Sequence, residues 1–122
     1  MSAKALRVFV VEDEPMIRIV VTDMLVVLGH TIAAEAGNVD EALPLAPSTE
    51  FDLALLDVNL QGKLITPVAE LIKARGCPII FATAYGPDVL PKEFSDHPFL
   101  QKPFEMDILA KAIDEMFRSR SR

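Results

Sequence analysis

The sequence predicts one α/β domain with a five-stranded parallel sheet and helices on both faces. Short apolar runs of strand length alternate along the chain with longer segments of helical periodicity, a pattern that is typical of βαβ units. The chain has 122 residues, about the length of one domain, and 51% of them are hydrophobic. That fraction suffices for a single hydrophobic core in a chain of this length. We therefore expect a single domain over residues 1–122.

The first strand and helix are predicted from the N-terminal part of the chain. Leu6–Val11 is rich in β-branched residues and is expected to form a strand. Glu12–Glu14 and Pro15 follow, and acids before a proline favour the start of a helix. Gly29 is well placed to end that helix. The apolar positions that recur at helical spacing are Ile17, Val20, Val21, Met24, Leu25 and Leu28.

The second strand and helix are less clearly marked. Thr31–Glu35 is a weaker strand candidate. Asn38, with Glu41 three residues later, resembles a capping box at a helix start. Pro44 and Pro47 are expected to interrupt the helix, so it should be short.

The third strand, Phe51–Asp57, is an apolar run that ends in an acid. Such a run is typical of a strand buried on both faces. A loop containing Gly62 follows. Thr66 and Pro67 then begin the next helix as cap and first-turn proline, and Gly76 ends it. The residues expected to face the core are Val68, Leu71 and Ile72.

The last third of the chain predicts two strands and one long helix. Pro78–Ala82 is the fourth strand and Phe99–Leu100 a brief fifth. Pro87 and Pro91 limit any fourth helix between these strands to one or two turns. The last helix is predicted from an apolar stripe formed by Ile108, Leu109, Ala112, Ile113, Met116 and Phe117.

Composition excludes several classes of function. The formal net charge is −6, which argues against direct nucleic-acid binding. No apolar run approaches the roughly 20 residues of a membrane span, and the N-terminal run is too short for a secretory signal. The one cysteine, Cys77, cannot form an internal disulfide, which favours a reducing compartment. We expect a cytoplasmic domain with no membrane contact and no output domain in this chain.

Polar residues stand at the carboxyl ends of four predicted strands. They are Glu12 with Asp13, Asp57, Thr83 and Lys102. Ligands of open α/β sheets bind at this edge. Taken alone, Asp57 could equally be an acid that ends a strand or caps a loop. Four strand ends with complementary chemistry make such a coincidence a poorer explanation.

Three carboxylates close together repel one another unless they are compensated. Mg²⁺ prefers oxygen ligands of this kind, and Lys102 adds a further positive charge. The compensated site is then able to receive an anion such as a phosphoryl group. Asp57 could act as a nucleophile on phosphorus and form an aspartyl phosphate. Thr83 could donate its hydroxyl to a phosphoryl oxygen.

In order and spacing, these residues and the Lys102–Pro103 pair resemble the receiver domain of two-component response regulators, over essentially the whole chain. The resemblance implies a flavodoxin-like topology with strand order 2-1-3-4-5 and Asp57 as the phosphoacceptor. It also implies that Asp13, Asp57 and the backbone carbonyl of Asn59 hold Mg²⁺, with Glu12 assisting through water.

The same resemblance implies roles on the other side of the site. Lys102 pairs with the phosphoryl group, and the backbone of Ala84 also contacts it. Thr83 is the switch hydroxyl and Tyr85 the switch aromatic. The Lys102–Pro103 peptide is expected to be cis.

The segment Phe81–Gly86 also resembles the signature of a receiver subgroup known as FAT GUY, typical of alphaproteobacteria. The chain departs from common receivers at three places. Gln61 stands where a proline often opens the turn before Gly62, Pro44 lies inside the second helix, and the fourth helix is abbreviated.

The expected function is signalling. A histidine kinase or histidine phosphotransfer protein would phosphorylate Asp57. The face of the fourth helix, fifth strand and fifth helix would then change its affinity for a downstream protein. Beyond its own phosphorylation and dephosphorylation, the chain is not expected to be an enzyme.

Three alternatives are weaker. A phosphohydrolase of the haloacid dehalogenase type would carry its acid pair after the first strand, whereas Asp57 and Asn59 follow the third. A flavodoxin-like cofactor binder would have hydroxyl groups after the first strand instead of three acids. A receiver-like module that binds partners without phosphorylation would not need all the expected site residues.

Overall fold

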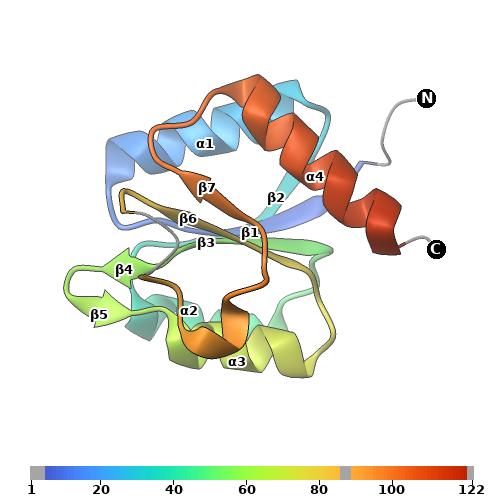
Figure 1. Ribbon diagram of the computed structural model, residues 1–122. Coiled ribbons are helices and arrows are strands. Elements are labelled where there is room, and N and C mark those ends of the chain that lie inside the picture. Colours follow the sequence, from blue (N-terminus) through green and yellow to red (C-terminus); the bar gives the residue numbers. More distant parts are fainter. Residues whose placement is uncertain (1–4, 86–88, 121–122) are drawn as a thin grey trace.

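The computed structural model describes residues 5–85 and 89–120, which form a three-layer α/β domain (Figure 1). Its central sheet has five parallel strands in the order β2-β1-β3-β6-β7. In chain order this is the predicted order 2-1-3-4-5. The strands are β1 (Arg7–Val11), β2 (Thr31–Ala36), β3 (Leu53–Asp57), β6 (Ile79–Thr83) and β7 (Phe99–Gln101).

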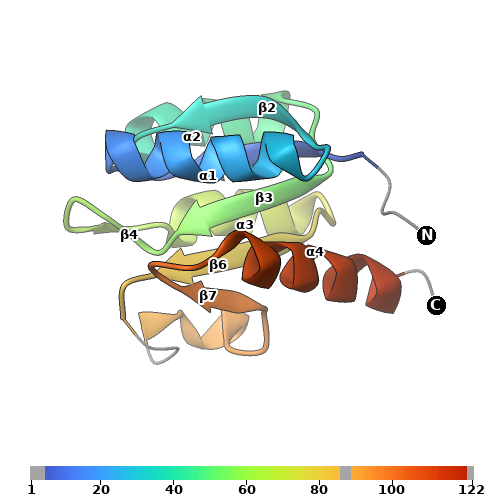
Figure 2. The same ribbon diagram turned by 90° about the horizontal axis from the view of Figure 1, so that it is seen from above.

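The described residues contain four α-helices, and these cover the sheet two on each face (Figure 1 and Figure 2). They are α1 (Pro15–Val27), α2 (Val39–Ser48), α3 (Thr66–Ala74) and α4 (Met106–Arg120). Residues of β1 and β3 face alternately into the two layers, so each face of the sheet has its own apolar core. None of the helices in the described residues is long and apolar enough to cross a membrane.

Helix α1 begins and ends where the sequence predicts. Pro15 occupies its first turn, and Gly29 has a φ of +96°, the left-handed conformation that favours glycine after a helix. Only Val21 and Leu25 of this helix are buried. The apolar repeat is therefore wider than the face that packs on the sheet.

Helix α2 starts at the predicted cap. The Asn38 side chain accepts a hydrogen bond from the Glu41 amide at 2.8 Å. Glu41 in turn accepts one from the amide of Gly37, one residue before the cap, at 2.8 Å. In the usual capping box, this second bond comes from the amide of the cap residue, here Asn38. In this helix it comes from the amide of Gly37.

The prediction that Pro44 and Pro47 interrupt this helix was wrong, because the helix runs through both prolines. Packing compensates for the missing amide donors. Val39, Ala42 and Ala46 are buried against the core and hold one side of the helix in place. The hydroxyl of Ser48 donates to the Pro44 carbonyl at 2.7 Å.

Helix α3 differs from the prediction in two details. Ile65 is the cap, and Thr66 is the first helical residue with no side-chain capping bond. Leu71 is 38% exposed, and Ala69 is buried beside Val68 and Ile72 in its place. A leucine is therefore left at the margin of the buried stripe.

The predicted loop around Gly62 contains a small antiparallel hairpin, β4 (Asn59–Leu60) and β5 (Lys63–Leu64). Its two turn residues, Gln61 and Gly62, have φ values of +54° and +84°. Positive φ at both central residues is the requirement of the tightest hairpin turns. The hairpin projects from the edge of the sheet beyond the carboxyl end of β3 (Figure 2).

Between β6 and β7, the described residues 89–98 include the short 3-10 helix η2 (Lys92–Phe94) and no α-helix. This agrees with the expected limit on the fourth helix, although Gly86 and Pro87 lie outside the described residues. Phe94 is fully buried, with its ring 5.3 Å from that of Phe81. In the described part of this segment, η2 therefore stands where the predicted interaction face would have its fourth helix, and that face remains a prediction.

Candidate functional site

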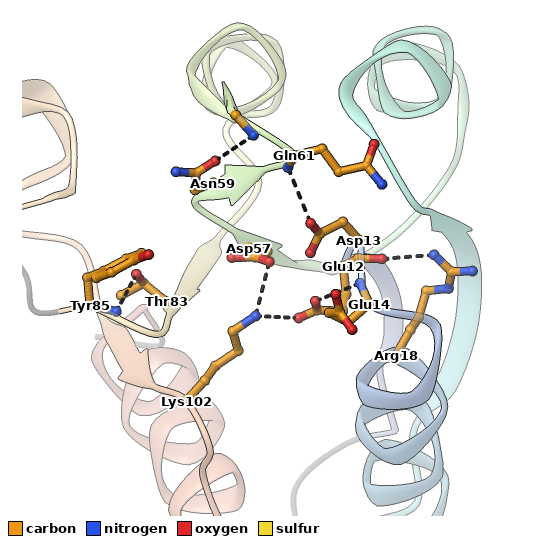
Figure 3. A network of polar contacts seen from close by, with 11 residues as sticks. Glu12, Asp13, Glu14, Arg18, Asp57, Asn59, Gln61, Thr83, Tyr85 and Lys102 are labelled. Carbon is orange, nitrogen blue, oxygen red and sulfur yellow. Dashed lines mark hydrogen bonds and ion pairs between the residues drawn. The ribbon is translucent and has the colours of Figure 1, made fainter.

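The carboxyl ends of β1, β3, β6 and β7 meet at one edge of the sheet and carry the polar residues that the sequence singled out (Figure 3). A cleft of about 370 Å³ opens there. It is lined by Asp13, Glu14, Asp57, Asn59, Gln61, Gly62, Thr83, Ala84, Tyr85 and Lys102. Of the predicted site residues, Glu12 alone lies behind the cleft wall.

Three carboxylates form the centre of this site. Glu12, Asp13 and Asp57 each offer an oxygen atom, and these atoms lie within 4.8 Å of one another. Glu12 and Asp57 are 4% and 5% exposed, whereas Asp13 is half-buried. The cluster therefore combines two largely buried acids with one half-buried acid, and both Asp13 and Asp57 line the cleft.

Lys102 bridges the two buried acids. Its ammonium nitrogen donates to Glu12 Oε1 at 2.8 Å and to Asp57 Oδ2 at 3.0 Å. Burial disfavours the charged ammonium, but the hydrogen bonds and attraction from the two carboxylates outweigh it and raise the pKa of Lys102. The lysine therefore stays charged, and one cation serves two buried anions.

One lysine does not neutralise the cluster. Burial and the negative charge of Glu12 raise the pKa of Asp57 from 3.8 to about 7, although Lys102 acts in the opposite direction. Burial is the larger cause and the charge of Glu12 adds to it, so both disfavour the ionised form of Asp57. The site is thus suited to a further cation.

Backbone amides support the acids from two loops. The amide of Glu14 donates to Glu12 Oε2 at 3.1 Å, and the amide of Gln61 donates to Asp13 Oδ2 at 3.2 Å. The side chain of Asn59 accepts from the Gly62 amide at 3.1 Å and closes the hairpin turn. Asn59, whose backbone carbonyl is expected to be a metal ligand, therefore lines the cleft. Its side chain stabilises the hairpin turn.

Thr83 and Tyr85 form the opposite wall. Thr83 is 1% exposed, and its hydroxyl oxygen accepts the amide of Tyr85 at 3.0 Å. The carbonyl of Thr83 accepts the amide of Lys102 at 2.7 Å. The Tyr85 side chain is 60% exposed and Ala84 is also exposed. The Lys102–Pro103 peptide is cis, as predicted.

The donor set fits Mg²⁺. Carboxylate oxygens are the protein ligands that this ion prefers, usually one or two of them with waters and phosphate oxygens. Asp13 and Asp57 line the open cleft, and Glu12 lies directly behind them. Burial and the charge of Glu12 both raise the pKa of Asp57, so a cation beside Asp57 would favour its ionised form.

Besides the Glu14 amide, two further contributors to the site were not predicted from the sequence. The Gln61 amide reaches Asp13 only because of the hairpin turn. Arg18 donates to the backbone carbonyl of Glu12 at 2.8 Å from the second turn of α1. The sequence could not identify Gln61 as a site residue, because its backbone amide, and not its side chain, makes the contact with Asp13. Arg18 is a polar residue in an otherwise apolar stretch, which is a usable but weak signal.

Comparison with known proteins identifies relatives for nearly all of this structure. Residues 8–114 match the family model of the response regulator receiver domain. The solution structure of SdrG from Sphingomonas melonis Fr1 is 41% identical, with a TM-score of 0.82, and the match covers 93% of this chain and 97% of that one. The crystal structure of the response regulator PhyR from Brucella abortus is 31% identical, with a TM-score of 0.81, covering 97% of this chain and 51% of that one.

Among curated proteins, the transcriptional regulatory protein PdtaR of Mycobacterium tuberculosis is 34% identical over 112 residues. That match covers 88% of this chain and 55% of PdtaR. The sensory transduction protein LytR of Staphylococcus haemolyticus is 30% identical, and 45% of it is covered. The chain thus spans about half the length of these curated relatives.

Proposed function

Because this chain belongs to the family of response regulator receiver domains of two-component systems, we propose that it accepts a phosphoryl group on Asp57. The observation that carries the proposal is the placement of Asp57. Its carboxylate lies at the floor of the cleft, bonded to Lys102 and grouped with Glu12 and Asp13. A phosphohistidine of a histidine kinase or histidine phosphotransfer protein is the proposed donor.

In the proposed step, an Asp57 carboxylate oxygen forms a bond to phosphorus while the phosphorus–nitrogen bond of the donor breaks. The donor imidazole leaves with the bonding electron pair, and an aspartyl phosphate remains on this chain. Lys102 already donates to Asp57 and can transfer a hydrogen bond to a phosphoryl oxygen. Ala84 and Thr83 line the same cleft and can receive the other oxygens.

The proposed cofactor is Mg²⁺, held by Asp13, Asp57 and the backbone carbonyl of Asn59, with Glu12 acting through water. When bound, the ion neutralises charge on the phosphoryl group and on the attacking carboxylate. The chain's own residues supply the rest. Lys102 donates to both Glu12 and Asp57 and orients their carboxyl groups, and the Gln61 amide orients Asp13. Asp57 must lose its proton to attack, since its pKa lies near 7 without a cation.

We propose that Thr83 and Tyr85 carry the switch. The Thr83 hydroxyl is bonded to the amide of Tyr85, so a move of Thr83 toward a phosphoryl group breaks that bond and frees the next loop. Tyr85 can then turn from solvent into the space that Thr83 leaves. A two-state element of this kind, biased by a new charge, is sufficient to change an interaction surface.

The proposed donor surface is the apolar groove beside α1. A groove of about 560 Å³ lies between α1 and the loop of Lys102, Pro103 and Phe104, and it shares Lys102 and Ala84 with the cleft at Asp57. Met16 is 73% exposed on its margin. Helices that bear the donor histidine could pack on this surface and bring the histidine to Asp57.

The proposed output surface lies on the other side of α4. A groove of about 930 Å³ runs between α4, the start of β7 and the end of α3, with Lys73, Lys111 and Glu115 on its walls. His97 and Phe99, next to η2, line its floor. A groove that combines apolar and charged side chains in this way suits a protein partner. We infer action in the cytoplasm and no catalysis beyond phosphorylation and dephosphorylation of this chain.

The second candidate function is a module that binds its partner without phosphorylation. Incubation with acetyl phosphate and Mg²⁺, followed by intact mass measurement, separates the two. The proposal expects one phosphoryl group per chain in the wild type and in Asp23→Asn, a matched change on the exposed side of α1. It expects none in Asp57→Asn or with EDTA. An equal mass increase in Asp57→Asn would contradict the proposal.

A further inference from the structure

We propose that Arg18 is a positioning residue for the acidic loop. In this proposal it fixes the Glu12–Asp13 peptide, and Gly37 is glycine because its missing side chain leaves room for the guanidinium. The inference rests on the proposed function, since its consequence is the affinity of the loop for a divalent cation.

The contacts of Arg18 hold the start of the loop from one side. Its Nη1 donates to the backbone carbonyl of Glu12 at 2.8 Å, and its Nε lies 3.4 Å from Glu35 Oε1 (Figure 3 shows the first contact). The side chain is 25% exposed. A guanidinium with donors in a rigid plane can bond a carboxylate and a carbonyl at once. Arg18 thereby ties β2, through Glu35, to the end of β1.

The backbone of Glu12 is consequently held at both of its polar groups. Its amide donates to the carbonyl of Ala36 at 3.1 Å, and its carbonyl accepts from Arg18. The Glu12 carbonyl belongs to the peptide between Glu12 and Asp13. Its orientation therefore determines the backbone position of Asp13. The side chains on either side of the peptide, Glu12 and Asp13, are two of the three clustered acids.

Gly37 lies against the guanidinium. A Cβ atom on Gly37 would stand 2.7 Å from Arg18 Nη1, closer than real contacts allow. The φ of Gly37 is not in the left-handed region, so space and not conformation requires glycine here. The obstructing atom is the tip of a flexible side chain. Gly37→Ala should therefore move Arg18 off the Glu12 carbonyl and leave the fold intact.

The charge of Arg18 and its role in orienting the loop predict opposite changes in Mg²⁺ affinity when the side chain is removed. Arg18 places a positive charge near a site for a cation. If it acted only through this charge, its removal would strengthen Mg²⁺ binding. Removing a residue that orients ligands would weaken it, by about tenfold for the supporting partners of metal ligands. The sign of the change in affinity therefore decides between the two roles.

The test measures Mg²⁺ affinity by NMR titration of the backbone amides of the loop in four variants. Arg18→Met and Gly37→Ala should each weaken binding, with Arg18→Met near tenfold. The double variant should bind no more weakly than Arg18→Met, because both changes break the same contact. Arg7→Met is the matched control, since it removes an arginine that pairs with Asp52 at the opposite edge of the sheet, and it should leave the affinity within a factor of about two.

A second readout needs no metal. The Asp13 amide shares its peptide with the Glu12 carbonyl, so its chemical shift in the metal-free protein should move in Arg18→Met and Gly37→Ala and stay unchanged in Arg7→Met. Unchanged or tighter Mg²⁺ binding in Arg18→Met, with a wild type that binds, would overturn the inference alone. A wild type that binds no Mg²⁺ would overturn the proposed function and this inference with it.

Discussion

The backbone amide of Gln61 lies 3.2 Å from the Asp13 carboxylate, so the β4–β5 hairpin is tied directly to an acid of the site. Gln61 makes this contact with a φ of +54°, a conformation that costs an ordinary residue about 1 kcal/mol or more. The contact and the strain belong to the same residue. Substitutions of Gln61 should therefore separate two effects. The φ preference of the new residue changes the stability of the turn, and the loss of its amide changes the site.

Gln61→Gly should stabilise the protein by about 0.5–1 kcal/mol, because glycine adopts positive φ freely while it keeps the amide that bonds Asp13. The free energy of unfolding from urea denaturation checks this. Gln61→Ala, which keeps the strain, serves as the control and should give no gain. Equal stability of Gly and Ala at this position would show that the turn is not strained.

Gln61→Pro, the residue that many receivers carry at this position, should be harmful here. Proline cannot adopt positive φ and has no amide to donate to Asp13. We expect a loss of about 2 kcal/mol or more and weaker Mg²⁺ binding than in Gln61→Ala. A proline variant as stable as Gln61→Ala would mean that the hairpin readily adopts another turn.

Asp57→Asn should stabilise the metal-free protein increasingly as the pH rises. The pKa of Asp57 is raised from 3.8 to about 7 in the fold, so the folded state holds a proton that the unfolded chain has lost. This contribution to stability is present at acidic pH and declines as pH rises through that window, reaching its minimum above pH 7. Asparagine does not titrate. Its advantage over aspartate should thus grow by about 2 kcal/mol between pH 5 and pH 8.

Urea denaturation at several pH values in EDTA measures that difference. Saturating Mg²⁺ should reduce it, because the cation stabilises the ionised form in the wild type. A difference that is constant with pH would contradict a raised pKa at Asp57.

Lys102→Met should destabilise the protein most at alkaline pH. The change leaves Glu12 and Asp57 buried without the cation that bonds both, at a cost of about 3 kcal/mol for a broken buried pair. Below pH 6 the cost should fall, since Asp57 then takes up a proton. Lys111→Met, at an exposed position of α4, is the matched control. A loss of equal size at pH 5.5 and pH 8 would show that Lys102 stabilises by packing instead of charge.

Tyr85 should report the switch directly, because it is the one tyrosine of a chain that has no tryptophan. Beryllofluoride with Mg²⁺, a substitute for a phosphoryl group on aspartate, should reduce quenching of Tyr85 fluorescence by iodide as the 60%-exposed ring turns inward. Thr83→Ala should abolish that change, whereas Thr83→Ser should keep it. Unaltered quenching in the wild type would contradict the proposed switch.

The sequence predicts the central strands β1, β3 and β6 well because they are buried on both faces and therefore appear as plain apolar runs. Asp57 and Thr83 are the last residues of two such strands. Because the strands are parallel, their carboxyl ends lie at the same end of the sheet, and the two side chains are expected close together. Strand order came from the family resemblance, since apolar runs carry no information about which strands are neighbours. The match of that order with the structure confirms the resemblance.

Features that depend on tertiary contacts were predicted poorly. Helix α2 tolerates Pro44 and Pro47 because Val39, Ala42 and Ala46 hold it against the core, and local propensity does not reveal such packing. The hairpin at Gln61 depends on a backbone conformation that a glutamine rarely adopts. The role of Arg18 depends on a glycine 19 positions later in the chain, and no local pattern connects the two residues.

The most direct test of the proposed function identifies the phosphorylated residue. After reaction with acetyl phosphate and Mg²⁺, borohydride reduces an aspartyl phosphate to homoserine, and tandem mass spectrometry of the digested protein locates it. We predict homoserine at position 57 alone, and none without Mg²⁺. Homoserine at position 13, modification of Glu12 instead, or no modified residue with a cognate phosphodonor as well, would contradict the assignment of Asp57 as the phosphoacceptor.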